Sequence, residues 1–199
     1  MKSIRSRIVF GAAALLLLSV LAGGIYLKVR GGIEYTGGEK FEDPRVVNAA
    51  HLGKSILVHM KSGLKPDDTQ PCVAFNTALG LVRSGYKVSI LIDARANADF
   101  MGHSPDKSKW GGYKLPAPMV RAVADELHIP LEEFPKTYME YMKWLSDQGA
   151  SVYMNATMNI LSGEASTIRD QMGVPAFIKL LTFPEMAKLL AESDRYIAY

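Results

Sequence analysis

The chain has 199 residues, of which 48% are hydrophobic and 22% charged, and its formal net charge is only +3. This composition supports one ordinary hydrophobic core and excludes wholesale disorder. No basic stripe interleaved with aromatic residues is present, so we expect no nucleic-acid partner. A single cysteine, Cys72, excludes both an intramolecular disulfide and a cysteine-rich zinc site.

Residues 1–30 predict a signal anchor that crosses a membrane once. The run 8–27 (IVFGAAALLLLSVLAGGIYL) carries no charge, and basic residues flank it on both sides. About 20 apolar residues at ~1.5 Å each span a hydrocarbon layer of ~30 Å, and this run is longer than a usual signal-peptide core. We expect either an uncleaved anchor or, because residues 22–24 (AGG) resemble a cleavage site, an exported soluble protein. In both cases the folded domain lies on the extracytoplasmic (periplasmic) side.

The first part of the folded domain predicts a strand, a helix and a second strand. Residues 31–52 have no sustained period and predict a linker before a domain over 53–199. The expected elements are a strand over 55–60 (SILVHM), a helix over 71–84 that Gly85 ends, and a strand over 87–94 (KVSILIDA). Near-continuous apolar strands suit a sheet covered on both faces, and this order of elements favours a right-handed parallel unit.

Residues 97–118 (NADFMGHSPDKSKWGGYKLPAP) predict an irregular insertion, because Gly, Pro and Lys dominate and no periodicity is visible. Insertions of this length are often lids or partner surfaces. Trp110, Tyr113 and the neighbouring lysines are a possible docking surface for an acidic protein partner. The alternative is a solvated surface loop.

The rest of the chain predicts three more strands separated by helices. A helix start signal stands at 182–185, where Thr, Pro and Glu occupy the N-cap, the first turn and the third helical position. The expected helices cover 119–127, 134–148, 156–161 and 182–192, and the expected strands cover 151–154, 176–181 and 195–199. The whole predicts a three-layer α/β domain with a mainly parallel sheet of about five strands.

In this order the segments resemble the DsrE/DsrF-like family over residues 53–199. The features that carry the resemblance are Ser62-Gly63 after the first strand, Ser84-Gly85 before the strand at 87–90, the sequence DQGA at 147–150, and the turn at Asn155. The resemblance implies a flavodoxin-like fold that often forms homo-oligomers. In active members it implies sulfur relay as a persulfide on a cysteine just after the third strand. That position here is Asn155, whose amide cannot carry a persulfide. The insertion and the anchor are further departures from the small cytoplasmic members.

Four residues are expected to gather at the carboxyl ends of the strands, where open α/β sheets bind ligands. Cys72, in the first turn of a helix, is a candidate reactive thiol, because a helix N-terminus favours a thiolate. The alternative is a buried, inert side chain. His59 and Asp93, on neighbouring strands, predict a pair that orients the imidazole as a base toward Cys72. Alternatively, each is a satisfied polar group at a strand end. Asn155, directly after the third strand, is the fourth residue expected at this edge of the sheet.

The sequence leaves two functions open. In one, Cys72 handles sulfur or redox chemistry, with His59 and Asp93 as further catalytic residues. In the other, a non-catalytic module of the same fold binds a ligand or a protein, with Asn155, Ser62 and Gly63 as the ligand-binding residues. Ten methionines and four histidines suggest a soft metal such as Cu(I), but no clustered ligand motif is present. We therefore expect no metal and no cofactor.

Overall fold

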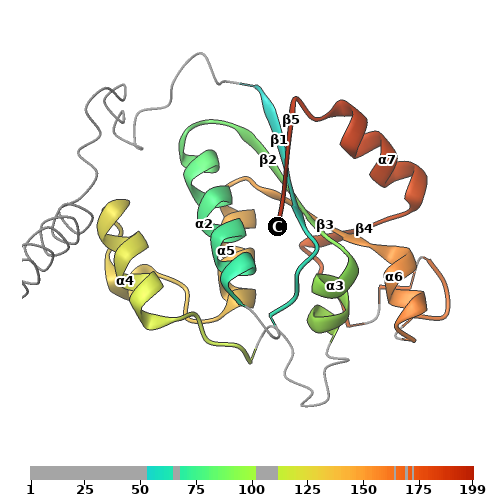
Figure 1. Cartoon of the computed structure of the whole chain (residues 1–199), viewed down its shortest axis with the longest axis horizontal. Coiled ribbons are helices and arrows are strands. Elements are labelled where there is room, and N and C mark those ends of the chain that lie inside the picture. The colour runs from blue at the N-terminus through green and yellow to red at the C-terminus, as the bar shows by residue number, and fades with distance from the viewer. Residues whose placement is uncertain (1–52, 65–67, 102–111, 164, 169, 172) are drawn as a thin grey trace, which may run out of the picture. The chain divides into compact units, whose positions relative to one another are not determined.

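The protein is described here by a computed structural model that covers residues 53–64, 68–101, 112–163, 165–168, 170–171 and 173–199. The expected anchor and linker, and residues 102–111 of the expected insertion, lie outside these ranges. No helix within the described ranges has the length and apolar character needed to cross a membrane. The centre of the domain is a five-stranded, wholly parallel sheet (Figure 1).

The strand order explains which helix covers which face of the sheet. Across the sheet the strands run β4 (Ile178–Leu181), β3 (Ser151–Asn155), β2 (Lys87–Ile92), β1 (Ser55–Met60) and β5 (Arg195–Ala198). The chain therefore steps in one direction from β1 to β4 and then returns to lie beside β1. Crossovers between parallel strands are right-handed. The last crossover runs back across the sheet, so its helix lies on the face opposite the helices of the earlier crossovers.

Two hydrophobic clusters lie on the two faces of the sheet. The larger cluster packs α2 (Thr69–Arg83) and α5 (Tyr138–Asp147) against even-numbered strand residues such as Val58, Ile90 and Val152. The smaller cluster packs Met186 of α7 (Phe183–Glu192) against Leu57 and Leu91. Side chains alternate along a strand, so odd-numbered strand residues point to the α7 face.

Local signals account for several of these boundaries. Thr137 and Glu140 form a capping box that starts α5 at Tyr138, later than the expected residue 134. Gly149 ends the same helix with φ +104°, a conformation that glycine adopts without steric cost. At the start of α7 the Glu185 carboxylate accepts a 2.8 Å hydrogen bond from the Thr182 N–H. The start signal at Thr182 is thus confirmed.

The expected insertion over 97–118 is wrong at both of its ends. α3 (Ala94–Met101) is a helix, and α4 (Ala117–Glu126) begins at Ala117. The buried side of α3 carries the polar residues Asn97 and Asp99 beside the apolar Ala96 and Phe100. These polar residues interrupt the apolar period by which a helix is recognised. Two further short elements are a 3-10 turn, η2 (Leu131–Glu133), and the helix α6 (Ala156–Leu161).

Candidate functional site

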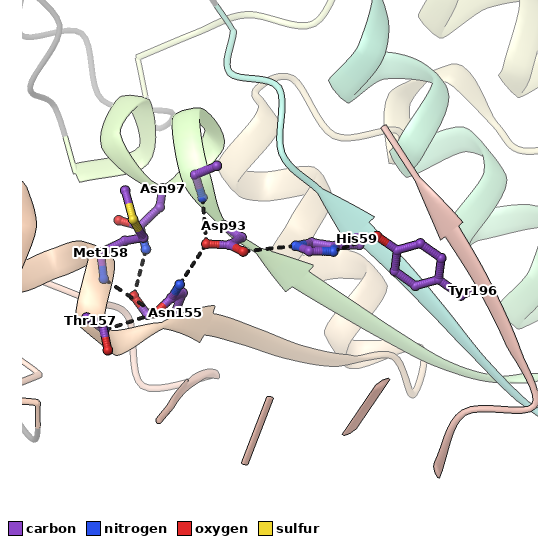
Figure 2. Close-up of polar contacts among 8 residues, drawn as sticks. His59, Asp93, Asn97, Asn155, Thr157, Met158 and Tyr196 are labelled. Carbon is purple, nitrogen blue, oxygen red and sulfur yellow. Dashed lines mark hydrogen bonds and ion pairs between the residues drawn. The ribbon is translucent and has the colours of Figure 1, made fainter. Parts of the chain in front are cut away.

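Four polar side chains from four neighbouring strands form one hydrogen-bonded row, which we call the polar row (Figure 2). Its members are Asn155 at the end of β3, Asp93 directly after β2, His59 on β1 and Tyr196 on β5. The first three occupy odd-numbered positions near the carboxyl ends of their strands. Tyr196 is opposite Leu57 in the β1–β5 register. The polar row therefore lies on the α7 face of the sheet.

The Asp93 carboxylate is the centre of the polar row. Its Oδ2 lies 3.1 Å from His59 Nε2, while its Oδ1 accepts 2.7 Å bonds from Asn155 Nδ2 and from the Ala94 N–H. The bond to His59 is the main cause that lowers the Asp93 pKa to about 2; burial opposes this, and the bonds from Asn155 and Ala94 lower the pKa further. Asp93 is consequently an ionised carboxylate at neutral pH.

The ionised carboxylate fixes the proton on the His59 ring. A carboxylate can only accept hydrogen bonds, so Nε2 carries the proton that faces Asp93. In a neutral imidazole Nδ1 is then an acceptor, and the Tyr196 hydroxyl at 2.9 Å donates to it. The His59 side chain is 10% exposed, whereas Tyr196 is 48% exposed. The chain of hydrogen bonds thus runs from a partly buried carboxylate, through a buried imidazole, to a half-exposed tyrosine.

Asn155 supports this series of hydrogen bonds at the Asp93 end. Its Oδ1 caps α6 by accepting from the N–H groups of Thr157 at 3.0 Å and Met158 at 3.4 Å. Its backbone carbonyl accepts a 3.0 Å bond from Asn97 Nδ2. The side chain is buried, and its oxygen and amide nitrogen both bond to the protein. These contacts give Asn155 a structural role, in which it holds the Asp93 carboxylate in place.

The backbone at Ala94 also holds Asp93 in position. Ala94 has φ +46°, in the left-handed region that residues with a Cβ rarely adopt. This turn directs the Ala94 N–H onto the Asp93 side chain. The Asp93 N–H in turn donates a 2.9 Å bond to the Met60 carbonyl on β1. A strained backbone that is held on both sides is a common feature of functional sites.

Cys72 lies away from the polar row. It packs in the cluster on the α2 and α5 face, is only 8% exposed, and has its Sγ 2.7 Å from the Tyr138 hydroxyl. Its N–H donates to the Asp68 carbonyl within the helix. Burial is the main cause that raises the pKa of Tyr138 above its usual range.

The expected arrangement, with His59 as a base toward Cys72, is therefore corrected. His59 does pair with Asp93, as the sequence predicted. However, its second ring nitrogen bonds to Tyr196, and the imidazole and the thiol lie on opposite faces of the sheet. Sequence reasoning missed both tyrosines, Tyr196 and Tyr138, because neither stands near its partner along the chain.

Ser62 and Gly63, the other expected ligand-binding residues, belong to the loop after β1. The Ser62 N–H donates a 3.1 Å bond to the Tyr199 carbonyl. Gly63 lies so close to the buried Asp99 that an added Cβ would clash with its Oδ2. Asp99 in turn forms an ion pair with Arg95. The hydrogen bonds of the polar row do not include Ser62 or Gly63, so the structure leaves their ligand-binding role a prediction.

A separate surface hollow of about 380 Å³ lies between α4 and η2. Arg121, Asp125, His128 and Leu131 are among its lining residues, and none of the expected site residues lines it. Within the part of the chain that the structure describes, no group of three or more His, Cys, Asp or Glu side chains is placed to hold a metal ion. The polar row is thus the described arrangement best suited to acid–base chemistry.

Comparison with known proteins adds little to this picture. No family model matches the chain, and no curated protein matches it. Among solved structures, the crystal structure of the ychN protein from E. coli aligns with 73% of this chain and 99% of its own, at 11% identity and a TM-score of 0.47. A likeness at that TM-score carries no argument about function. Membership of the DsrE/DsrF-like family therefore stays a prediction from the sequence.

Proposed function

We propose that the protein is a ligand-binding module in which Tyr196 exchanges a proton with a small polar ligand. His59 acts as the base, and Asp93 orients and stabilises it. The observation that carries the proposal is the unbroken chain of hydrogen bonds from Asp93 through His59 to Tyr196. This order of carboxylate, imidazole and hydroxyl is the arrangement by which proteins activate a hydroxyl group.

Each member of the chain has one task in the proposed reaction. When the ligand gives a proton to the Tyr196 oxygen, the hydroxyl proton passes to His59 Nδ1, and the reverse transfer returns a proton to the ligand. The positive imidazolium that results is stabilised by the Asp93 carboxylate at Nε2. The low pKa of Asp93 keeps the proton on the imidazole, where it can return to Tyr196. Base assistance of this kind contributes about 10²–10⁴-fold in rate.

The surroundings of Cys72 favour this proposal over thiol chemistry. A reactive thiol needs a thiolate that solvent can reach. Cys72 is buried, and its Sγ faces the hydroxyl of Tyr138, itself a group whose pKa is raised by burial. A neutral phenol beside the sulfur supplies no positive charge to stabilise a thiolate. We therefore assign Cys72 to the core.

The experiment that tests the proposal is acetylation of Tyr196 by N-acetylimidazole. The phenol oxygen forms a bond to the acetyl carbon, and its proton passes to His59. The bond between the acetyl carbon and the reagent's imidazole nitrogen breaks, and the departing imidazole takes up a proton from the solvent. The rate is measured by mass spectrometry of the peptide that contains Tyr196. We expect His59→Gln to slow acetylation about 10²-fold, and the matched variant His128→Gln, on the far side of the domain, to leave it unchanged.

Two results would contradict the proposal. One is equal acetylation of Tyr196 in the parent protein and in His59→Gln. The other is acetylation of Tyr196 no faster than that of tyrosines outside the polar row. Tyr196→Phe identifies the labelled peptide, because it removes the acetylated oxygen without changing the ring.

We further infer from the apolar run 8–27 that the domain is held at a membrane, on its extracytoplasmic side. The length of the run and its basic flanks support this location. Membrane fractionation, followed by protease treatment of intact spheroplasts, is the test. We expect the chain in the membrane fraction and its folded domain cut by the external protease. A chain found in the cytosolic fraction would overturn the inference.

A further inference from the structure

Three buried polar atoms lie at the interface between α3 and α6. They are Asn97 Oδ1, Asn159 Oδ1 and Asn159 Nδ2, and none of them has a hydrogen-bond partner. Asn97 is 0% exposed and Asn159 is 1% exposed. Burying a polar group without a partner costs more than a normal hydrogen bond contributes. Three such atoms on two facing helices therefore point to a ligand that satisfies them together.

The backbone brings the two amides to one place. Asn97 Nδ2 donates to the Asn155 carbonyl. Asn159 stands four residues after Asn155, so the same carbonyl lies one helical turn below it. α3 and α6 pack against each other, and Asn159 is one of the buried residues of α6. From this packing and burial we infer that both amides face the same small region of the interface.

The available donors and acceptors define the chemistry of the ligand. Asn97 must direct its nitrogen at the Asn155 carbonyl, which leaves its Oδ1 as an acceptor. Asn159 offers one oxygen and one nitrogen in either orientation of its amide. The unpartnered atoms are thus two acceptor oxygens and one donor nitrogen, which carries two N–H groups. This set matches a molecule that donates two hydrogen bonds and accepts one.

We propose that the Asn97–Asn159 pair binds one ordered water molecule. The water donates to the two Oδ1 atoms and accepts from Asn159 Nδ2. Buried waters typically make about three such bonds to groups that are otherwise unsatisfied. The near-complete burial of both residues excludes a larger ligand from this site.

The water bound between α3 and α6 also supports the polar row. α3 begins directly after Asp93, and α6 begins directly after Asn155. A water that joins the two helices holds Asp93 and Asn155, which precede them, at a fixed separation. It therefore keeps Asn155 Nδ2 hydrogen-bonded to the Asp93 carboxylate. Asn97 and Asn159 are thus positioning residues for the polar row. The water site itself does not depend on whether Tyr196 exchanges protons.

The direct test is nuclear magnetic resonance of the isotope-labelled full-length protein in detergent micelles. We expect rotating-frame cross-peaks between a long-lived water and the side-chain amide protons of Asn159. Their absence would overturn the proposal. This measurement needs no variant, so it remains decisive even if substituted chains fail to fold.

The sign of a stability change gives a second test. Asn159→Leu keeps the branched shape and the number of heavy atoms of the side chain and has a higher helix propensity, so it would stabilise the fold if the amide were simply unsatisfied. With the water bound, we expect the variant to lower the ratio of folded to unfolded protein about tenfold. The matched control Met158→Leu, one residue earlier in α6, should leave the ratio nearly unchanged. An Asn159→Leu variant more stable than the parent would contradict the water site.

Discussion

Replacing Asp93 by Asn removes the charge at the centre of the polar row while keeping the shape of the side chain. The amide oxygen can still accept from Asn155 Nδ2 and the Ala94 N–H, as Asp93 Oδ1 does. The amide nitrogen then faces His59 Nε2 as a donor. Two donors cannot share one hydrogen bond, so we expect the imidazole proton to move to Nδ1, where the Tyr196 hydroxyl then accepts a hydrogen bond instead of donating one.

The magnitude follows from the pKa of Asp93. A fall from 3.8 to about 2 corresponds to about 2.5 kcal/mol of stability at neutral pH. Because the folded-state pKa is depressed, this stabilisation is complete above the unfolded-state pKa near 4 and is lost as the pH falls through about 2. We therefore expect Asp93→Asn to destabilise the protein by about 2–3 kcal/mol at pH 7. The difference from the parent protein should shrink between about pH 4 and pH 2.

Urea unfolding of the full-length protein in mild detergent, at a series of pH values, measures this difference. Asp147→Asn is the matched control, since Asp147 pairs with Lys143 on the exposed side of α5. An exposed pair of this kind contributes less than about 0.5 kcal/mol. A loss of stability in Asp93→Asn that is the same at pH 7 and pH 2 would refute the argument from the charged carboxylate.

Three other predictions concern the supporting structure. Cys72 should resist alkylation in the native protein at pH 7 and react readily after denaturation, and fast native labelling would contradict its burial. Ala94→Gly should stabilise the protein by about 0.5–1 kcal/mol in thermal unfolding, because glycine adopts φ +46° without steric cost; a loss of stability would show that the turn is unstrained. Gly63→Ala should cost about 1–3 kcal/mol through its clash with Asp99. Gly80→Ala, in open space within α2, should add up to about 1 kcal/mol. Equal effects of the two glycine substitutions would disprove the close approach at Gly63.

The sheet was predictable because its strands are short apolar runs between clear turn signals. β1 matches the expected range, and the expected parallel sheet of about five strands is confirmed. α6 and the capping box of α7 are also found where the sequence predicted them. α3 was missed, because Asn97 and Asp99 interrupt its apolar period. Asn97 bonds to Asn155 at the end of β3, and Asp99 lies against Gly63 in the loop after β1. Local sequence does not carry that information.

The candidate site was only partly predictable for a related reason. Strand ends can be read from the sequence, so His59, Asp93 and Asn155 were expected at one edge of the sheet. The face that each side chain occupies depends on register and on helix rotation, which are set by tertiary packing. Cys72 turns toward Tyr138 on α5 for this reason. Tyr196 joins the row only because β5 returns beside β1.

The central claim is that His59 presents an unprotonated Nδ1 to Tyr196, and long-range ¹H–¹⁵N spectroscopy of the imidazole ring tests it most directly. At neutral pH we predict one stable tautomer with the proton on Nε2, the nitrogen that faces Asp93. A proton on Nδ1, or the averaged signals of a ring that exchanges between tautomers, would contradict the account.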